Sequence, residues 1–487
     1  MAIHVHDQMR RKKVALETRD PGRVAMYTCG PTVYNLIHVG NARTFLWFDF
    51  IRRYLIYRGY DVIYVMNYTD VDDRIIERAA VEGVPTEAIT SKYSKAFEDD
   101  MAALGVGPPD IIARATDHIE DMVEGIYGLI KTGSAYESEG DVFFSVESFD
   151  DYGKLSGRTL DDMRAGERVE VRTSKRHPLD FALWKSAKEG EPSWPSPWGP
   201  GRPGWHIECS VMSTKYLGMG FDIHGGASDL TFPHHENEIA QAEALSGNEP
   251  FVRNWLHAGL VQFELEKMSK SLGNTVLARD VTKAYPRPVA RYWALMGSYR
   301  TQLTFSDEAL ADAAQGYERW TTFLAAARHA LGDAMPRGGE DGGGQGRDTT
   351  ARPFVDRFVA ALDDDFNTAE GFAVVHDLVR EGNRLLEDAQ SGDEGAQGAL
   401  AELAAGFFEM TAVMGFEFEA DAGSPQLVGS LVEYLLEIRE DARKSKDFEA
   451  ADAIRSRLVS MGVAIEDTAS GARWRLSTSG APEPSGP

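Results

Sequence analysis

The sequence predicts an α/β protein in which a doubly wound parallel sheet is followed by a helical bundle and a small α+β module. Strand and helix patterns alternate through the first third of the chain, which is typical of a parallel sheet. Helical periodicity dominates after the glycine-rich stretch 338–346. With 487 residues, the chain has enough material for roughly two to four domains.

The first βαβ unit is predicted between residues 24 and 65. A short apolar strand at 24–27 precedes a loop and a helix over about 42–58, and the second strand follows at 61–65. Ligands of such sheets lie beyond the carboxyl ends of the strands. We therefore expect Cys29 and the stretch NYTDVDD at 67–73 to lie at the same rim of the sheet.

The middle of the first domain has a different pattern. Residues 141–203 indicate hairpin-like strands and a Pro/Trp-rich loop, which we interpret as part of an insertion over about 115–205. Further strands are predicted around Ile223 and over 256–263.

The predicted organisation has six parts. The last folded part combines a helix at 448–460 with a hairpin at 463–476. The parts are the sheet domain (1–300), a helical region (301–337), a flexible Gly-rich linker (338–350), a helical bundle (351–430), a C-terminal module (431–476) and a disordered tail (477–487).

Composition limits the classes of partner and location. The formal net charge of -25 disfavours non-specific coating of DNA or RNA and leaves specific recognition of a nucleic acid open. The N-terminus has no apolar signal core and no run is long enough to cross a bilayer, so we expect a cytoplasmic protein without a membrane partner. In a reducing compartment, Cys29 and Cys209 are expected to be buried thiols or metal ligands rather than a disulfide.

Four residues form a candidate metal centre. His234 and Glu238 lie on one face of a predicted helix, and with Cys29 and Cys209 they offer the thiolate, imidazole and carboxylate ligands that suit Zn²⁺. The ligands come from three remote segments, so spacing alone favours two buried thiols and a solvated helix start over a metal. The stretch HHENE lacks the second histidine of HExxH, which argues against a zinc protease.

Two further motifs indicate a phosphate site. The stretch IHVGNART begins the first helix, where Gly40 permits close approach of a ligand and His38 can donate to a phosphate oxygen. In EKMSKSLGN, Lys267 and Lys270 can neutralise a departing pyrophosphate. A capping histidine and a solvated basic turn are the alternatives for each motif alone, but their combination favours nucleotide chemistry.

These motifs resemble those of class I aminoacyl-tRNA synthetases, and more narrowly those of the cysteinyl-tRNA synthetases. Two positions depart from the usual pattern: Asn41 replaces the second histidine of the His-Ile-Gly-His signature, and Ala227 replaces a third glycine in HGGG. The resemblance covers nearly the whole chain and rests on YTCGPTVYNLIHVGNAR, NYTDVDDRII, GDVFFSVESFDDYGKLSGR, PLDFALWKSAKEGEPSWPSPWGPGRPGWHIECS, DIHGGASDLTFPHHENEIAQ and KMSKSLGN.

The resemblance implies a Rossmann-like catalytic domain with a connective insertion, a stem-contact region, a tRNA-binding bundle and an anticodon-binding module. It implies L-cysteine, ATP with Mg²⁺ and cysteine tRNA as substrates, one Zn²⁺ per chain, a monomer, and no role for DNA. The implied zinc ligands are Cys29, Cys209, His234 and Glu238. The implied nucleotide site comprises His38, Gly40, Asn41, Lys267 and Lys270, and the implied amino-acid site comprises Gly30, Thr69, Trp205 and Asp229.

The acceptor of the activated cysteine is the open alternative, because ligases that join cysteine to an amino sugar share both signatures and the zinc ligands. The C-terminal module distinguishes the two classes. Arg473, Trp474 and Arg475 place cations on one face of a predicted strand and an aromatic ring on the other, as in readers of unpaired RNA bases. Trp474 alone is more typical of packing, but the resemblance favours an anticodon reader.

Overall fold

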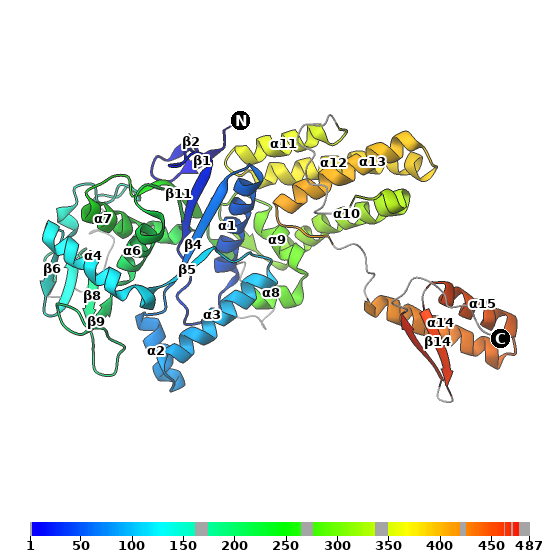
Figure 1. Cartoon of the computed structure of the whole chain (residues 1–487), viewed down its shortest axis with the longest axis horizontal. Coiled ribbons are helices and arrows are strands. Elements are labelled where there is room, and N and C mark those ends of the chain that lie inside the picture. Colours follow the sequence, from blue (N-terminus) through cyan, green and yellow to red (C-terminus); the bar gives the residue numbers. More distant parts are fainter. Residues whose placement is uncertain are drawn as a thin grey trace. The chain divides into compact units, whose positions relative to one another are not determined.

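A five-stranded parallel sheet lies at the centre of the chain (Figure 1). Its strands follow the order β11 (Val252–Ala258), β10 (Phe221–Ala227), β3 (Arg23–Thr28), β4 (Asp61–Tyr68) and β5 (Ile111–Arg114). All four pairings are parallel. The chain runs outward from β3 in one direction and later in the other, so the topological switch point lies between β3 and β10. The predicted doubly wound fold class is confirmed.

The computed structural model describes residues 2–160, 174–263, 276–336, 349–418, 425–461, 463–468 and 471–476. The chain divides into two compact units, Met1–Glu417 and Phe418–Pro487. The predicted linker at 338–350 and the tail at 477–487 lie largely or wholly outside the described residues. Each of the described helices is too short or too polar to cross a membrane.

Helices connect the parallel strands. Helix α1 (Val39–Tyr57) joins β3 to β4 and begins three residues before the predicted start, because the His38 side chain caps it by accepting from the backbone N–H of Asn41. Helices α2 (Asp73–Glu82) and α3 (Thr86–Ala103) join β4 to β5, and α6 (Trp205–Leu217) precedes β10. Helix α7 (His234–Ser246) joins β10 to β11.

The insertion between β5 and β10 forms a second sheet beside helix α4 (Ile119–Thr132). Its antiparallel strands are β6 (Ala135–Ser138), β7 (Asp141–Phe144), β8 (Phe181–Ser186) and β9 (Gly201–Pro203). Phe144 and Trp184 of this sheet share one apolar core with Tyr27 and Val65 of the parallel sheet. The insertion is therefore packed against the site-bearing end of the parallel sheet and does not form a core of its own.

The single strand predicted at 256–263 is wrong, because the structure has two strands there. Strand β11 ends at Ala258, and β12 (Val261–Phe263) pairs with β13 (Leu303–Phe305) instead. Gly259 leaves the ladder because its carbonyl accepts from Arg43 Nη1 at 2.5 Å and its N–H donates to the carbonyl of Tyr299 at 2.7 Å. A short hairpin of β1 (His4–Asp7) and β2 (Lys12–Ala15) precedes the sheet.

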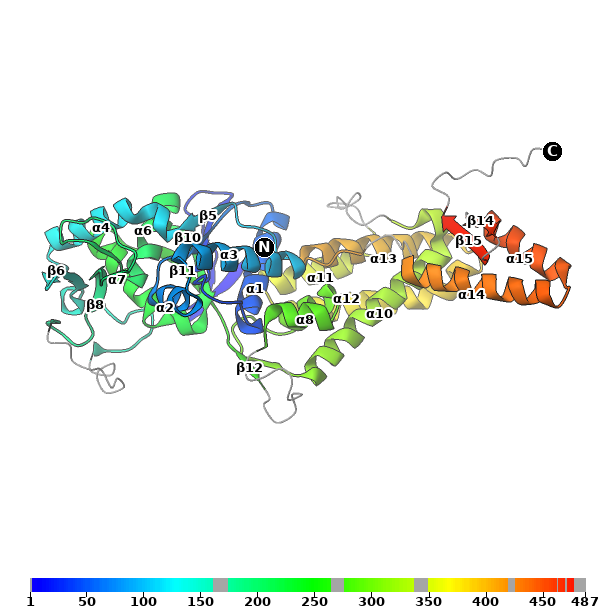
Figure 2. The same ribbon diagram turned by 90° about the horizontal axis from the view of Figure 1, so that it is seen from below.

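The remainder of the first unit is helical. Helices α8 (Ala278–Ala284) and α9 (Arg287–Leu295) lead to a bundle of α10 (Asp307–Leu331), α11 (Arg352–Asp363), α12 (Thr368–Gln390) and α13 (Glu394–Val413). Trp320 is buried in the bundle and stacks on Phe372 with ring centroids 5.4 Å apart. In Figures 1 and 2, the bundle and the β6–β9 sheet lie at opposite ends of this unit, with the parallel sheet between them.

The second unit contains helices α14 (Pro425–Lys444) and α15 (Phe448–Ser460) and the antiparallel pair β14 (Val463–Thr468) and β15 (Gly471–Leu476). Trp474 packs against its small core of Val432, Leu458 and Val463. Helix α14 runs across residue 430, the expected boundary of this module, so the boundary between the compact units lies earlier in the chain than expected.

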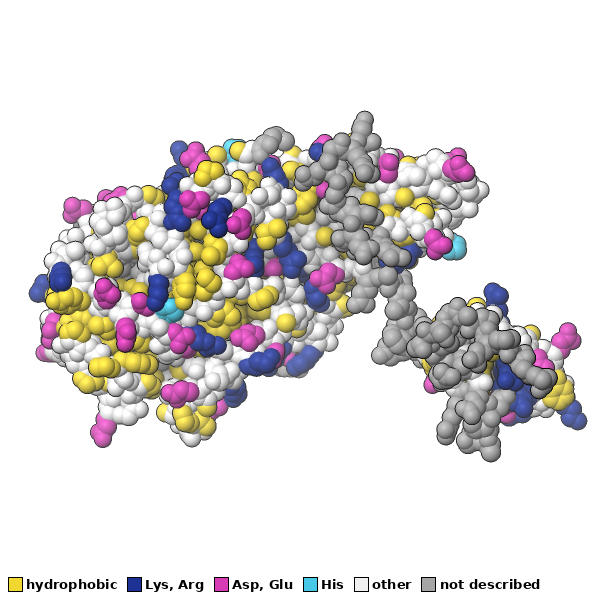
Figure 3. Space-filling model, viewed as in Figure 1, with side chains coloured by type: hydrophobic (Ala, Val, Ile, Leu, Met, Phe, Trp, Pro, Cys, Tyr) yellow, Lys and Arg dark blue, Asp and Glu magenta, His cyan; other side chains and the backbone are white. Residues whose placement is uncertain are grey.

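One face of the molecule shows how the charged side chains are distributed (Figure 3). On the face drawn in Figure 3, basic and acidic side chains are interspersed. The acidic excess of the chain is therefore not gathered into a single patch on this face.

Candidate active site and metal centre

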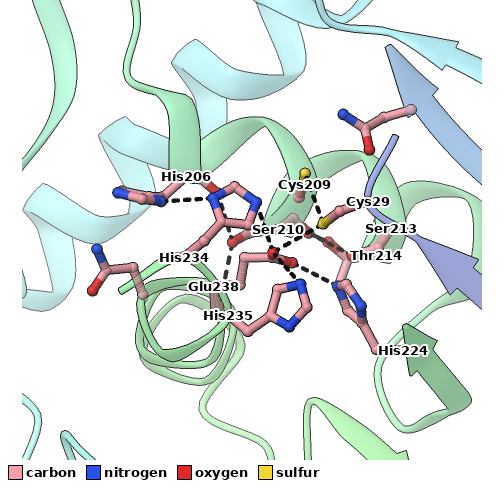
Figure 4. A network of polar contacts seen from close by, with 12 residues as sticks. Cys29, His206, Cys209, Ser210, Ser213, Thr214, His224, His234, His235 and Glu238 are labelled. Atoms are coloured by element: carbon pink, nitrogen blue, oxygen red, sulfur yellow. Dashed lines mark hydrogen bonds and ion pairs between the residues drawn. The ribbon is translucent and has the colours of Figure 1, made fainter. Parts of the chain in front are cut away.

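The fold brings the four candidate metal ligands together at the switch point of the sheet. Cys29 follows β3, Cys209 lies on α6, and His234 and Glu238 lie on α7. One ligand atom from each lies within 4.8 Å of the others, and all four side chains are buried. Figure 4 shows the four side chains pointing toward one another.

The distances within this cluster are short for groups of like charge. The two sulfur atoms lie 3.6 Å apart, and Cys29 Sγ lies 3.5 Å from Glu238 Oε1. His234 Nε2 lies 3.1 Å from the same carboxylate oxygen. Two thiolates and a carboxylate this close would repel one another strongly in a buried site unless protons or a cation lay between them. The four side chains, two thiols, an imidazole and a carboxylate, each offer one ligand atom, which fits the four-coordinate binding of Zn²⁺.

The protonation equilibria reflect the same crowding. Burial raises the pKa of the Cys29 thiol well above its usual value, and its hydrogen bond to Cys209 adds to the effect. Burial alone would raise the pKa of Cys209, but the hydrogen bond from Cys29 lowers it, to about 6. Burial lowers the pKa of His234, but the charge of Glu238 outweighs burial and raises the pKa to about 10. Burial and the contacts within the cluster therefore shift the pKa values of the two thiols in opposite directions.

Further histidines surround the four ligands. His206 Nδ1 lies 2.8 Å from His234 Nδ1, and His224 Nε2 lies 2.8 Å from Glu238 Oε2. His235 joins His224, Cys29 and Glu238 in a second group whose ligand atoms lie within 4.8 Å of one another. No role was predicted for His206, His224 or His235 from the sequence, although all three lie within the motif stretches WHIECS, DIHGGASDL and HHENE. The number of histidines in those short stretches was the feature of the sequence that could have indicated a role for them near the metal ligands.

The candidate phosphate site lies at the N-terminus of α1. The Nδ1 atom of His38 accepts from the backbone N–H of Asn41 at 3.3 Å, and Asn41 Oδ1 accepts from the His38 N–H. A Cβ at Gly40 would lie 2.9 Å from His38 Nδ1, so the ring occupies the space that any side chain there would need. Burial lowers the pKa of His38 and the charge of Asp229 partly opposes it, so Asp229 faces the same rim. The predicted lysines, Lys267 and Lys270, lie outside the described residues.

The candidate amino-acid site borders the metal cluster. The ring of Trp205 is 4.2 Å from that of His234, inclined by 32°, and Trp205 is 38% exposed. The Gly30 N–H donates to Asn67 Oδ1 at 2.9 Å, and a Cβ at Gly30 would lie 1.7 Å from the Asn67 carbonyl oxygen. Only glycine permits this approach of the two strand ends.

Thr69 is buried at the end of β4, and Asp229 is exposed after β10. The structure thus places Gly30, Thr69 and Asp229 after the ends of β3, β4 and β10, and Trp205 at the start of α6.

Three family models match the chain. The catalytic domain of class I (C) tRNA synthetases matches residues 15–315, the DALR domain matches 357–419, and the anticodon-binding domain of cysteinyl-tRNA ligases matches 429–475. Among solved structures, methionyl-tRNA synthetase of Mycobacterium tuberculosis in complex with methionyl-adenylate is similar, with a TM-score of 0.58 and 18% identity. The similarity covers 80% of this chain and 89% of that one, and it concerns the fold alone.

Similarity to characterised sequences is much higher. The cysteine–tRNA ligase of Desulfitobacterium hafniense is 47% identical over 481 residues, covering 98% of this chain and all of that protein. The cysteine–tRNA ligase of Brevibacillus brevis is 46% identical over 475 residues, with the same coverage. The chain belongs to the cysteine–tRNA ligase family of class I aminoacyl-tRNA synthetases.

Proposed function

We propose that this chain is a cysteine–tRNA ligase, which joins L-cysteine to ATP as cysteinyl-adenylate, releases pyrophosphate and transfers cysteine to the 3′ end of cysteine tRNA. The observation that carries the proposal is the buried cluster of two thiols, an imidazole and a carboxylate next to the helix that begins at His38. The cluster provides a site for a thiol substrate, and the helix N-terminus provides one for phosphates.

Cys29, Cys209, His234 and Glu238 are the residues that would hold Zn²⁺. His206 supports this set over the overlapping histidine group, because it occupies Nδ1 of His234 and leaves Nε2 directed toward the cluster. When bound there, Zn²⁺ would stabilise a coordinated substrate thiolate. The hydroxyl of serine is a harder donor that ionises much less readily, so the donor set favours cysteine over serine by chemistry as well as shape.

The chain's own residues position the reactants for activation. His38, Gly40 and Asn41 bind phosphates of ATP, which is taken with Mg²⁺, and Lys270 with Lys267 neutralises the departing pyrophosphate. Holding the substrate carboxylate in line with the α-phosphate lowers the barrier, because the reactants are already brought together and oriented. The amino acid's remaining groups are held by Gly30, Thr69, Trp205 and Asp229.

The match of residues 429–475 to an anticodon-binding domain favours tRNA over an amino sugar as the acceptor. We assign the helical bundle and this module to tRNA binding, and expect a cytoplasmic monomer. In the test, the intact chain is incubated with labelled cysteine, ATP, Mg²⁺ and cysteine tRNA, and label precipitated with the tRNA is measured. Stable label on tRNA is the expected result; cysteine-dependent ATP–pyrophosphate exchange without label on tRNA would favour the amino-sugar acceptor.

A chain ending at Glu417 separates the two half-reactions. It retains the first compact unit and should keep cysteine-dependent ATP–pyrophosphate exchange within about twofold of the intact chain. Charging of tRNA should fall by roughly 100-fold, because the anticodon contacts are lost while the catalytic elements remain. Equal charging by both chains would contradict the role of the second unit.

A further inference from the structure

Glu208 is a buried carboxyl group that neither the metal cluster nor the phosphate site uses. It lies on α6 immediately before Cys209, and its side chain is fully buried. Its Oε2 accepts from the Thr69 hydroxyl at 2.8 Å. Its Oε1 has no hydrogen-bond partner within the described ranges. A buried carboxyl with a single partner is costly, so its retention calls for an explanation beyond stability.

The contact between Glu208 and Thr69 ends a chain of hydrogen bonds. The backbone N–H of Gly30 donates to Asn67 Oδ1 at 2.9 Å, and Asn67 Nδ2 donates to Thr69 Oγ1 at 3.4 Å. Thr69 Oγ1 then donates to Glu208. The single proton of the hydroxyl is directed at α6 and one of its lone pairs at β4, which leaves one lone pair with a fixed direction.

The backbone of Thr69 is held as firmly as its side chain. Its N–H donates to the Pro31 carbonyl and its carbonyl accepts from the Val33 N–H, both at 3.2 Å. The loop after β3 and the end of β4 therefore fix the position of Cα, while Glu208 fixes the direction of the hydroxyl.

We infer that Glu208 is a positioning residue of the amino-acid site, which acts on cysteine binding by orienting the hydroxyl of Thr69. This inference rests on the proposed function, in which Thr69 holds the backbone end of the substrate. Successive residues of a helix diverge by about 100° around its axis, so Glu208 and Cys209 serve different ends of the site. One turn of α6 thus carries Cys209, which lies at the thiol end of the substrate, and Glu208, which orients Thr69 at the backbone end.

A double-mutant cycle tests whether Glu208 acts through Thr69. Glu208→Leu and Thr69→Val each remove the hydrogen bond while keeping side-chain size, and each should raise the KM for cysteine in ATP–pyrophosphate exchange about 5- to 10-fold. The KM for ATP and the zinc content per chain should stay unchanged. The double variant should have the same KM for cysteine as Thr69→Val alone, because Glu208 acts only through the Thr69 hydroxyl.

Two further variants separate positioning from a general loss of structure. Glu208→Gln retains an oxygen that can accept from Thr69 and should restore the KM for cysteine to within about twofold of the unmodified chain. Glu243→Gln is the matched control. Glu243 is another buried glutamate, bound by Lys154 and the Phe251 N–H, and its substitution should leave that KM unchanged.

Three results would overturn the inference. They are effects of Glu208→Leu and Thr69→Val that multiply in the double variant, loss of zinc from Glu208→Leu, and an unchanged KM for cysteine in Glu208→Leu. Each of these results requires that the unmodified chain catalyses cysteine-dependent exchange. If the unmodified chain shows none, the proposed function fails instead, and the two failures are thereby distinguished.

Discussion

The two ends of the candidate site are built in different ways. At the thiol end, which is the cluster of Cys29, Cys209, His234 and Glu238, four buried side chains from three segments converge. His206 contacts Nδ1 of His234, and His224 contacts Oε2 of Glu238. At the phosphate end, the candidate residues His38, Gly40 and Asn41 lie together at the start of one helix, and His38 is only half-buried. In the proposed function, discrimination between cysteine and serine therefore depends on fixed side chains, whereas phosphate binding depends on the placement of one helix.

Helix α1 is anchored far from its N-terminus. Asp49 accepts from Arg291 Nη2 at 2.5 Å and from Arg53 Nε at 2.9 Å, and Arg291 also donates to the carbonyl of Met414 at the end of α13. Burial alone would raise the pKa of Asp49, but Arg291 and Arg53 hold it below its usual value. An ion pair therefore joins α1 to α9, and a hydrogen bond from Arg291 joins both to the end of α13.

The largest effect is expected at the thiol end. Replacing Cys209 by Ser removes a soft ligand from the centre of the cluster. Cysteine-dependent exchange should fall by more than about 100-fold together with the zinc content, since even outer partners of a metal ligand are worth 10- to 100-fold. Ser213→Ala, one turn further along α6, is the matched control and should keep both. Unchanged exchange in Cys209→Ser would refute the metal site.

The next effect concerns the anchor of α1. Asp49→Asn leaves Arg291 buried with its charge uncompensated and should lower the free energy of unfolding by about 3 kcal/mol. Because the pKa of Asp49 is depressed in the folded state, its contribution is complete above the unfolded value of about 3.9 and declines as pH falls through the folded value. Denaturant titrations at pH 7 and at acid pH measure both. Asp61→Asn, in an exposed pair with Arg23, should cost far less.

The smallest effect distinguishes the two ends directly. In Gly40→Ala the new methyl group displaces the His38 ring, so kcat/KM for ATP should fall about 10-fold while zinc content is retained. Gly398→Ala in α13 is the control, since a Cβ there meets nothing within 4 Å. A parallel loss of zinc in Gly40→Ala would mean that the two ends are not independent.

Local patterns predicted the elements that form the site better than they predicted the site itself. The βαβ unit placed Cys29 at the rim from alternation and strand-end position alone. The approach of Cys209 to Cys29 depends on the packing of α6 against a sheet formed mostly by distant segments, so spacing favoured unrelated thiols. The resemblance to a family supplied what spacing could not.

Other features were not accessible from local patterns. The break at Gly259 arises from hydrogen bonds to Arg43 and Tyr299, which lie far away in the sequence. Glu208 resembles an ordinary polar helix residue, and its burial against Thr69 follows from tertiary packing. The boundary predicted at residue 430 falls inside helix α14, because a shift in composition does not mark where a helix begins.

The separation of the thiol-end residues along the chain has a consequence for assembly. Cys29 is 180 residues from Cys209 and 209 residues from Glu238. No short fragment carries all four candidate ligands, so the Zn²⁺ binding that we propose requires the parallel sheet to have closed around β3 and β10. During synthesis, a nascent chain would bind the proposed Zn²⁺ only after α7 has emerged and docked. Metal content would then serve as a measure of completed folding of the catalytic half.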